Sequence, residues 1–321
     1  MNVFRPFGIA ACLLALALSG CGKEQPATQS SGQEAAKVAK TAKATRPVEE
    51  KVPPYSYAAP VKGHVKEANI GDFDLVDGVA YTATNGGGTV IYVVSKAIAS
   101  PLLAGAACPL TQARALAKLR NASYAEVTLD ADGKSKYFAA GMPFGGSLTD
   151  LTPRDWISTL KVDADHAKGN VVHRRDGKYE FDLPLSTPKF DQISDGDRQQ
   201  KRKLPATTPK PTGQAVLATY MALRDAALKK DLKATLLALG FDAKEATAIR
   251  GMEGIDADFA VYADRFLTPG TPGDPWSKPG GGQIRGEGTK ASGRKFYNDY
   301  YFDLCGDRLV LTGIVEQAAT Q

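Results

Sequence analysis

The residues best suited to chemistry or recognition lie close together near the C-terminus. On an extended strand, alternate side chains point to the same side, which places Tyr297, Asp299, Tyr301 and Asp303 on one face. Tyrosine rings beside carboxylates are suited to line a pocket or bind a partner surface; the alternative is that they only pack into a core. A catalytic alternative is a hydrolase or isomerase, in which Asp299 or Asp303 has its pKa raised by apolar surroundings and acts as a general acid or base.

Metal ligands are sparse in this sequence. It contains three histidines, His64, His166 and His173, and two of them follow Asp163 and Asp165. No pair of histidines has the i, i+4 helical spacing that zinc enzymes use. We therefore interpret these side chains as solvated loop residues and predict no metal site.

Other short motifs are incomplete. Asp130 and Asp132 resemble the first half of a calcium loop, but the closing glutamate is absent, so a hairpin turn is predicted. The glycine runs at 86–88 and 280–282 lack the Lys-Ser/Thr of a phosphate-binding loop. The surroundings of Ser147 do not match a nucleophile elbow. We predict no cofactor.

The N-terminus has the pattern of an export signal. Arg5 precedes an apolar run over residues 7–18, which is too short to cross a bilayer. The tetrad Leu18-Ser19-Gly20-Cys21 that follows resembles the lipobox of bacterial lipoproteins. The other interpretation is an ordinary signal peptide cleaved between Ala15 and Gly20.

The lipobox resemblance implies where the protein is located and that it is attached to a membrane. In that family the cysteine, here Cys21, becomes the first mature residue and carries acyl chains that anchor the protein to a membrane. Lipoproteins that stay in the inner membrane tend to have Asp directly after the lipidated cysteine. Here that position is Gly22. In a host with two membranes, this implies the outer membrane, with the protein facing the periplasm.

The same resemblance leaves two cysteines for pairing. Cys12 would leave with the signal peptide and Cys21 would be acylated, so Cys108 and Cys305 remain. An even number of thiols in an oxidising compartment favours a disulfide. The opposing interpretation is two separate buried thiols.

The composition changes along the chain and predicts five segments of mixed α+β class. We expect a signal peptide (1–20), a lipidated disordered tether (21–60), a mainly-β domain (61–195), a Pro/Lys-rich linker (196–212) and an α+β domain (213–317). In the first domain, strand-like alternation and one helix starting at Pro109 predict a β-sandwich-like fold. In the second, helices precede three antiparallel strands that form a meander.

Helices followed by an aromatic strand meander resemble the nuclear-transport-factor-like (SnoaL-like) cone over residues 213–316. That family includes both enzymes and binding modules, so the resemblance leaves the function open.

The charge distribution excludes one function class. The net charge is +5, but the basic excess lies in the leader and linkers, and both predicted domains are close to neutral. A nucleic-acid-binding module needs a basic face on a folded domain, so we expect no nucleic-acid partner. We predict a membrane-tethered, non-catalytic envelope protein that binds an unknown envelope protein or small ligand as an adaptor, scavenger or toxin neutraliser.

Overall fold

The computed structural model describes most of the chain after residue 51 and confirms a mixed α+β protein. The described residues are 52–58, 60–67, 70–83, 88–106, 108–144, 147–150, 156–162, 166–173, 177–184, 186–190, 207–266, 272–289 and 293–318. Cys21, residues 196–206 of the predicted linker, and Asp163 and Asp165 lie outside them. Within the described ranges, no helix is both long enough and apolar enough to cross a membrane.

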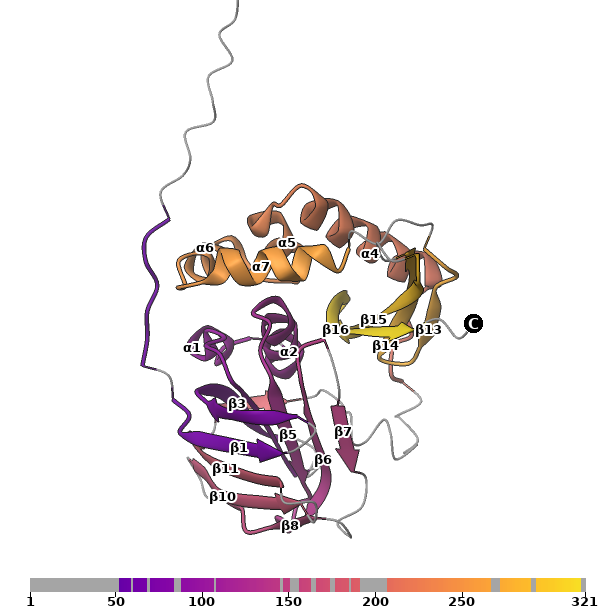
Figure 1. Cartoon of the computed structure of the whole chain (residues 1–321). Helices are drawn as coiled ribbons and strands as arrows, with labels where there is room; N and C mark the ends of the chain where they lie inside the picture. The colour runs from indigo at the N-terminus through magenta and orange to yellow at the C-terminus, as the bar shows by residue number, and fades with distance from the viewer. Residues whose placement is uncertain are drawn as a thin grey trace, which may run out of the picture. The chain divides into compact units, whose positions relative to one another are not determined.

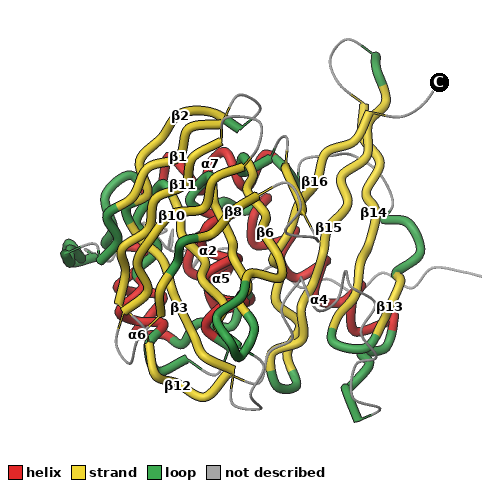
Figure 2. Tube along the Cα trace, turned by 90° about the horizontal axis from the view of Figure 1, so that it is seen from below, coloured by secondary structure: helices red, strands yellow, loops and turns green. Residues whose placement is uncertain are grey.

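The N-terminal half contains two six-stranded sheets (Figures 1 and 2). The first has the order β2 (Gly71–Leu75), β1 (Gly63–Glu67), β11 (Gly177–Pro184), β10 (His166–His173) and β8 (Trp156–Ser158), with β9 (Lys161–Val162) also on β10. The second has the order β12 (Ser186–Phe190), β3 (Asp77–Ala83), β4 (Thr89–Val94), β5 (Tyr124–Leu129), β6 (Ser135–Gly141) and β7 (Ser147–Asp150). Among the strand pairs that the structure describes, β12–β3 alone is parallel.

Residue alternation explains how these sheets pack. Ile91 and Val93 of β4 pack into a core shared with Val65 of β1 and Val171 of β10, so this core lies between the two sheets. The intervening residues Val90, Tyr92 and Val94 belong to a second core. Because both faces of β4 are covered, all six of its residues are buried.

Two helices cover the second sheet, where the sequence predicted one. The short α1 (Ser100–Leu103) precedes α2 (Pro109–Leu119), which has proline in its first turn. Figure 1 shows both helices between this sheet and the C-terminal half. All residues of α2 except Lys118 are buried, since the helix is covered on both sides.

In its described residues, the C-terminal half has four helices and one antiparallel sheet. The helices are α4 (Gly213–Leu228), α5 (Leu232–Ala238), α6 (Ala243–Arg250) and α7 (Ile255–Asp264). The sheet has the order β13 (Trp276–Lys278), β14 (Gly281–Thr289), β15 (Lys295–Cys305) and β16 (Arg308–Ala318). Tyr300 and Phe302 of β15 belong to the same core as Tyr220 of α4 and Phe266. The inner face of the sheet therefore packs against the helices.

One continuous core joins the two halves. It contains Leu116 of α2 and Tyr92 of β4 as well as Leu236 of α5 and Ile314 of β16. Residues Glu50–Gln321 accordingly form one compact unit, and the predicted boundary at 196–212 falls inside it.

The first described residues are bound to both halves. Tyr55 donates its backbone N–H to the carbonyl of Gly251, between α6 and α7, at 2.9 Å. Tyr57 donates its hydroxyl to the buried Asp77 and accepts a hydrogen bond from the N–H of Ala99. The folded unit thus begins several residues before the predicted end of the tether at residue 60.

Candidate functional site

The outer face of the C-terminal sheet brings together three of the four predicted site residues. Tyr297, Asp299 and Tyr301 alternate along β15 with the buried Asn298, Tyr300 and Phe302, so they point away from the helices. The neighbouring strand β14 places Arg285 directly opposite Asp299.

Asp299 is a buried carboxylate on this otherwise accessible face. It is 1% exposed, and its two oxygens accept hydrogen bonds from Nε and Nη2 of Arg285 at 2.7 and 2.8 Å. Gln317 Nε2 donates a third hydrogen bond to Asp299 at 3.1 Å. Both carboxylate oxygens therefore already have partners, which argues against the catalytic alternative at this residue.

Arg285 is fixed from a second direction by an aromatic ring. Its guanidinium carbon lies 4.9 Å from the centre of the Tyr297 ring, within the range of a cation–π contact. The hydrogen bond to Asp299, together with its charge, raises the pKa of Arg285. Burial, followed by the charge of Asp299, raises the pKa of Tyr301. The Arg285 side chain is nevertheless 46% exposed, so a preformed cation faces solvent here.

Apolar side chains flank this ion pair. Trp276 of β13 pairs with Gln283 of β14, which pairs with Tyr301 of β15. On the other side of β15, Asp299 pairs with Val315 of β16. Because paired residues point to the same side of a sheet, Trp276 and Val315 lie on the outer face. Trp276 is 56% and Val315 40% exposed. We call Trp276, Arg285, Tyr297, Asp299, Tyr301, Val315 and Gln317 the outer-face cluster. Arg285 is not predictable as a site residue from the sequence, because only the strand register reveals its position opposite Asp299.

Asp303 lies apart from this cluster although it shares its strand. It is 4% exposed, and its Oδ2 atom is 3.5 Å from Nη1 of Arg114 on α2. Nη2 of Arg114 donates to both oxygens of Glu126 on β5, at 2.7 and 2.6 Å. Asp303 therefore belongs to a buried ionic network that connects the two halves of the protein.

The structure joins Cys108 and Cys305 in a disulfide. Their Cα atoms are 5.7 Å apart, although 197 positions separate them in the sequence. Cys108 immediately precedes α2, and Cys305 ends β15. The bond therefore links the N-terminal and C-terminal halves beside the Arg114 network.

His64 and His166 each lie within hydrogen-bond distance of surface carboxylates. The ring nitrogens of His64 lie 3.0 Å from Asp72 and 2.9 Å from Asp74, and the hydrogen bond with Asp74 raises the pKa of His64. His166 lies 2.9 Å from Asp182. Among the described residues, no group of three or more His, Cys, Asp or Glu side chains is arranged to hold a metal ion.

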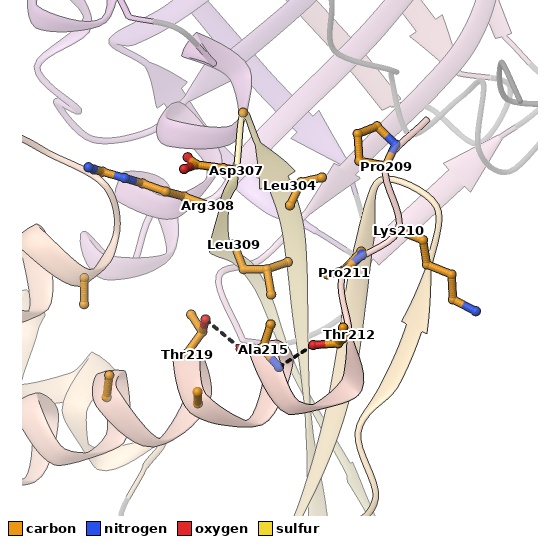
Figure 3. A pocket seen from close by; sticks show the side chains of 14 residues that line it. Pro209, Lys210, Pro211, Thr212, Ala215, Thr219, Leu304, Asp307, Arg308 and Leu309 are labelled. Carbon is orange, nitrogen blue, oxygen red and sulfur yellow. Dashed lines mark hydrogen bonds between the residues drawn. The ribbon is translucent and has the colours of Figure 1, made fainter. Parts of the chain in front are cut away.

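A groove of about 840 Å³ is a second candidate site, which the sequence analysis did not identify (Figure 3). It lies between the segment before α4, the exposed side of α4, and the turn that joins β15 to β16. Its lining is mainly apolar and includes Ala215, Ala218, Ala222, Leu304 and Leu309. The one available signal was the alanine spacing of i, i+3 and i+7 on α4, which places these residues on one side of a helix.

Comparisons with known proteins assign neither site. No family model, no curated protein and no solved structure matches this chain. The function is therefore argued from the geometry of the two sites.

Proposed function

We propose that this protein is a lipid-anchored envelope protein that binds a protein partner through the outer-face cluster, without catalysis. The observation that carries the proposal is Arg285, which is held rigidly yet half exposed. An arginine fixed in this way loses little side-chain entropy when a partner binds, so more of the contact energy appears as affinity.

The free edge of Arg285 indicates the chemistry of the partner. Asp299 occupies Nε and Nη2, and Nη1 makes no hydrogen bond to any described residue. Guanidinium groups bind carboxylates through such edges. Trp276 and Val315 offer apolar surface beside it. Because Trp, Tyr and Arg dominate the energetics of protein interfaces, we propose that the partner presents an acidic side chain surrounded by apolar residues.

We also propose a fold type for each half of the protein. We take the two N-terminal sheets as β-sandwich-like and residues 213–317 as a cone like that of nuclear-transport-factor-like proteins. The supporting observations are the core between the two sheets and the order of helices before strands. On this view the C-terminal cone carries the outer-face cluster, and lipidation of Cys21 holds the protein at the outer membrane, facing the periplasm.

Partner binding can be tested by site-specific photocrosslinking in cells. A photoreactive phenylalanine analogue at Val315 should give a discrete adduct whose crosslinked peptide contains Asp or Glu. The same analogue at Val172, which is 44% exposed on β10, serves as the control position and should not give this adduct. An adduct formed equally from both positions would contradict the proposal.

The contribution of Arg285 can then be measured with the identified partner. Arg285→Ala should weaken binding by about 2 kcal/mol, roughly thirtyfold in Kd, because it removes the preformed cation at the centre of the surface. Arg285→Lys keeps the charge but loses the planar fork, so it should restore only part of the affinity. An Arg285→Ala variant with unchanged Kd would exclude the outer-face cluster as the binding surface.

Anchoring is tested separately by fractionation. Cys21→Ser removes the thiol that the lipobox resemblance assigns to acylation, so the variant should leave the membrane fraction. Cys12→Ser, nine residues earlier in the predicted signal peptide, is the matched control and should remain anchored. A Cys21→Ser variant that still sediments with membranes after a salt wash would disprove lipidation at Cys21.

A further inference from the structure

The described chain enters the folded unit through a short extended segment. Residues 52–58, which we call the strap, form neither helix nor strand, and β1 begins only at Gly63. In Figure 1 the strap passes α6 before the chain reaches the N-terminal sheets. Every strap side chain is at least partly exposed, and Val61 is the first buried residue in the described part of the chain. The strap therefore has little buried surface to hold it.

Hydrogen bonds hold the strap at two points, one on each half of the protein. Tyr55 is bonded to the carbonyl of Gly251, and the Tyr57 hydroxyl is bonded to Asp77 and to the N–H of Ala99. The strand β1 that follows is instead paired with β2 on one side and with β11 on the other. A segment with few bonds and little burial opens at a lower free-energy cost than a strand paired on both sides.

The contact at Gly251 is close enough to be disrupted selectively. A Cβ atom at Gly251 would overlap the carbonyl oxygen of Pro53 and lie 2.9 Å from the backbone nitrogen of Tyr55. The φ angle of Gly251 is −81°, which any residue adopts, so a side chain there does not strain its own backbone. A substitution at Gly251 therefore displaces the first half of the strap and leaves the end of α6 intact.

Opening the strap leaves the rest of the fold supported. Without Tyr57, the Asp77 carboxylate still accepts hydrogen bonds from the N–H groups of Gly78 and Ile98, at 2.8 and 2.7 Å. The Cys108–Cys305 disulfide still joins the two halves. The strap can therefore leave its two contacts while both halves stay folded and joined.

We propose that the strap is a releasable extension of the tether, which opens when a bound partner pulls against the membrane anchor. Force from the anchor reaches the strap before any strand, and it loads the contacts at Gly251 and Asp77 one after the other. Release adds residues 52–60 to the tether, which is at most about 30 Å of extended chain. The inference rests on the proposed anchor and partner, since these supply the force.

Strap opening itself is measured without anchor or partner, by hydrogen exchange of the purified full chain in urea below its unfolding midpoint. The amides of Tyr55 and Ala99 should exchange through local opening, so their protection should stay nearly constant with urea. Protection of the Val65 amide in β1 should fall, because it needs a larger unfolding. Equal urea dependence at Tyr55 and Val65 would overturn the proposal, because the strap would then open only with the rest of the fold.

A matched pair of glycine variants tests the contact with α6. Gly251→Ala should accelerate exchange of the Tyr55 amide by about tenfold or more and leave that of Val65 unchanged. Gly105→Ala adds the same methyl group where no atom lies within 4 Å, so it should change neither amide. Unchanged exchange of Tyr55 in Gly251→Ala would overturn the assignment of this contact as a holding point.

Release under load is tested by pulling the full chain between handles at residue 21 and at the C-terminus. The first event should be a reversible lengthening of at most about 30 Å, which precedes the unfolding of any strand. Gly251→Ala should shift this event to lower force, and Gly105→Ala should not. A first lengthening that exceeds this limit would overturn the proposal. Neither result affects crosslinking at Val315 or fractionation of Cys21→Ser, so failure of the strap and failure of the proposed function remain distinguishable.

Discussion

Replacing both Cys108 and Cys305 by alanine is expected to lower the free energy of unfolding by about 2–5 kcal/mol. The bond closes a loop between positions 197 apart, and so long a loop restricts the unfolded chain strongly. Both cysteines are at least partly buried, so alanine avoids placing new hydroxyl groups beside the core. The measurement is equilibrium denaturation in urea, followed by tryptophan fluorescence.

Reduction provides the matched control for this variant. A thiol reductant should destabilise the unmodified protein by a similar amount and leave the double-alanine variant unchanged. Equal denaturation midpoints for the variant and the oxidised protein would show that the cross-link does not contribute to stability.

Glu126→Ala is expected to cost about 3–5 kcal/mol of stability, because it leaves the buried Arg114 guanidinium without its main partner. The side chains of Arg114 and Glu126 are 6% and 2% exposed, so water cannot replace the lost carboxylate. Asp303 remains 3.5 Å from Arg114, which places the expected loss toward the lower end. Thermal and urea denaturation measure the effect.

A triple variant separates the buried charges from simple packing. Arg114→Met with Glu126→Leu and Asp303→Asn removes all three charges of the buried network and keeps side chains of similar volume, so it should be more stable than Glu126→Ala alone. Lys168→Ala is the control at an exposed pair, 2.9 Å from Asp182, and should cost less than about 1 kcal/mol. A Glu126→Ala loss no greater than that of Lys168→Ala would mean that the buried network is not needed for stability.

Features that depend on neighbouring residues were predictable from the sequence. Asp242 and Glu245, three residues apart in the sequence, form a capping box, because both partners lie within one helical turn. The alternation on β15 placed Tyr297, Asp299 and Tyr301 on one face, because side chains alternate along any strand. The export-signal pattern and the lipobox resemblance are likewise local, and they stay predictions because they lie outside the described residues.

Features that depend on strand register and on packing between distant segments were decided only by the tertiary structure. Arg285 reaches Asp299 because β14 and β15 pair in one particular register, and nothing in either segment alone specifies it. Asp303 shares the strand and the alternation of Asp299, yet it joins Arg114 because α2 packs against that end of the sheet. The groove arises where α4 and the β15–β16 turn come together. The sequence by itself therefore determined which residues share a helix turn or a strand face, because those relations follow from backbone periodicity. The partners of each face were decided only by the tertiary structure, because they depend on long-range packing that no local pattern encodes.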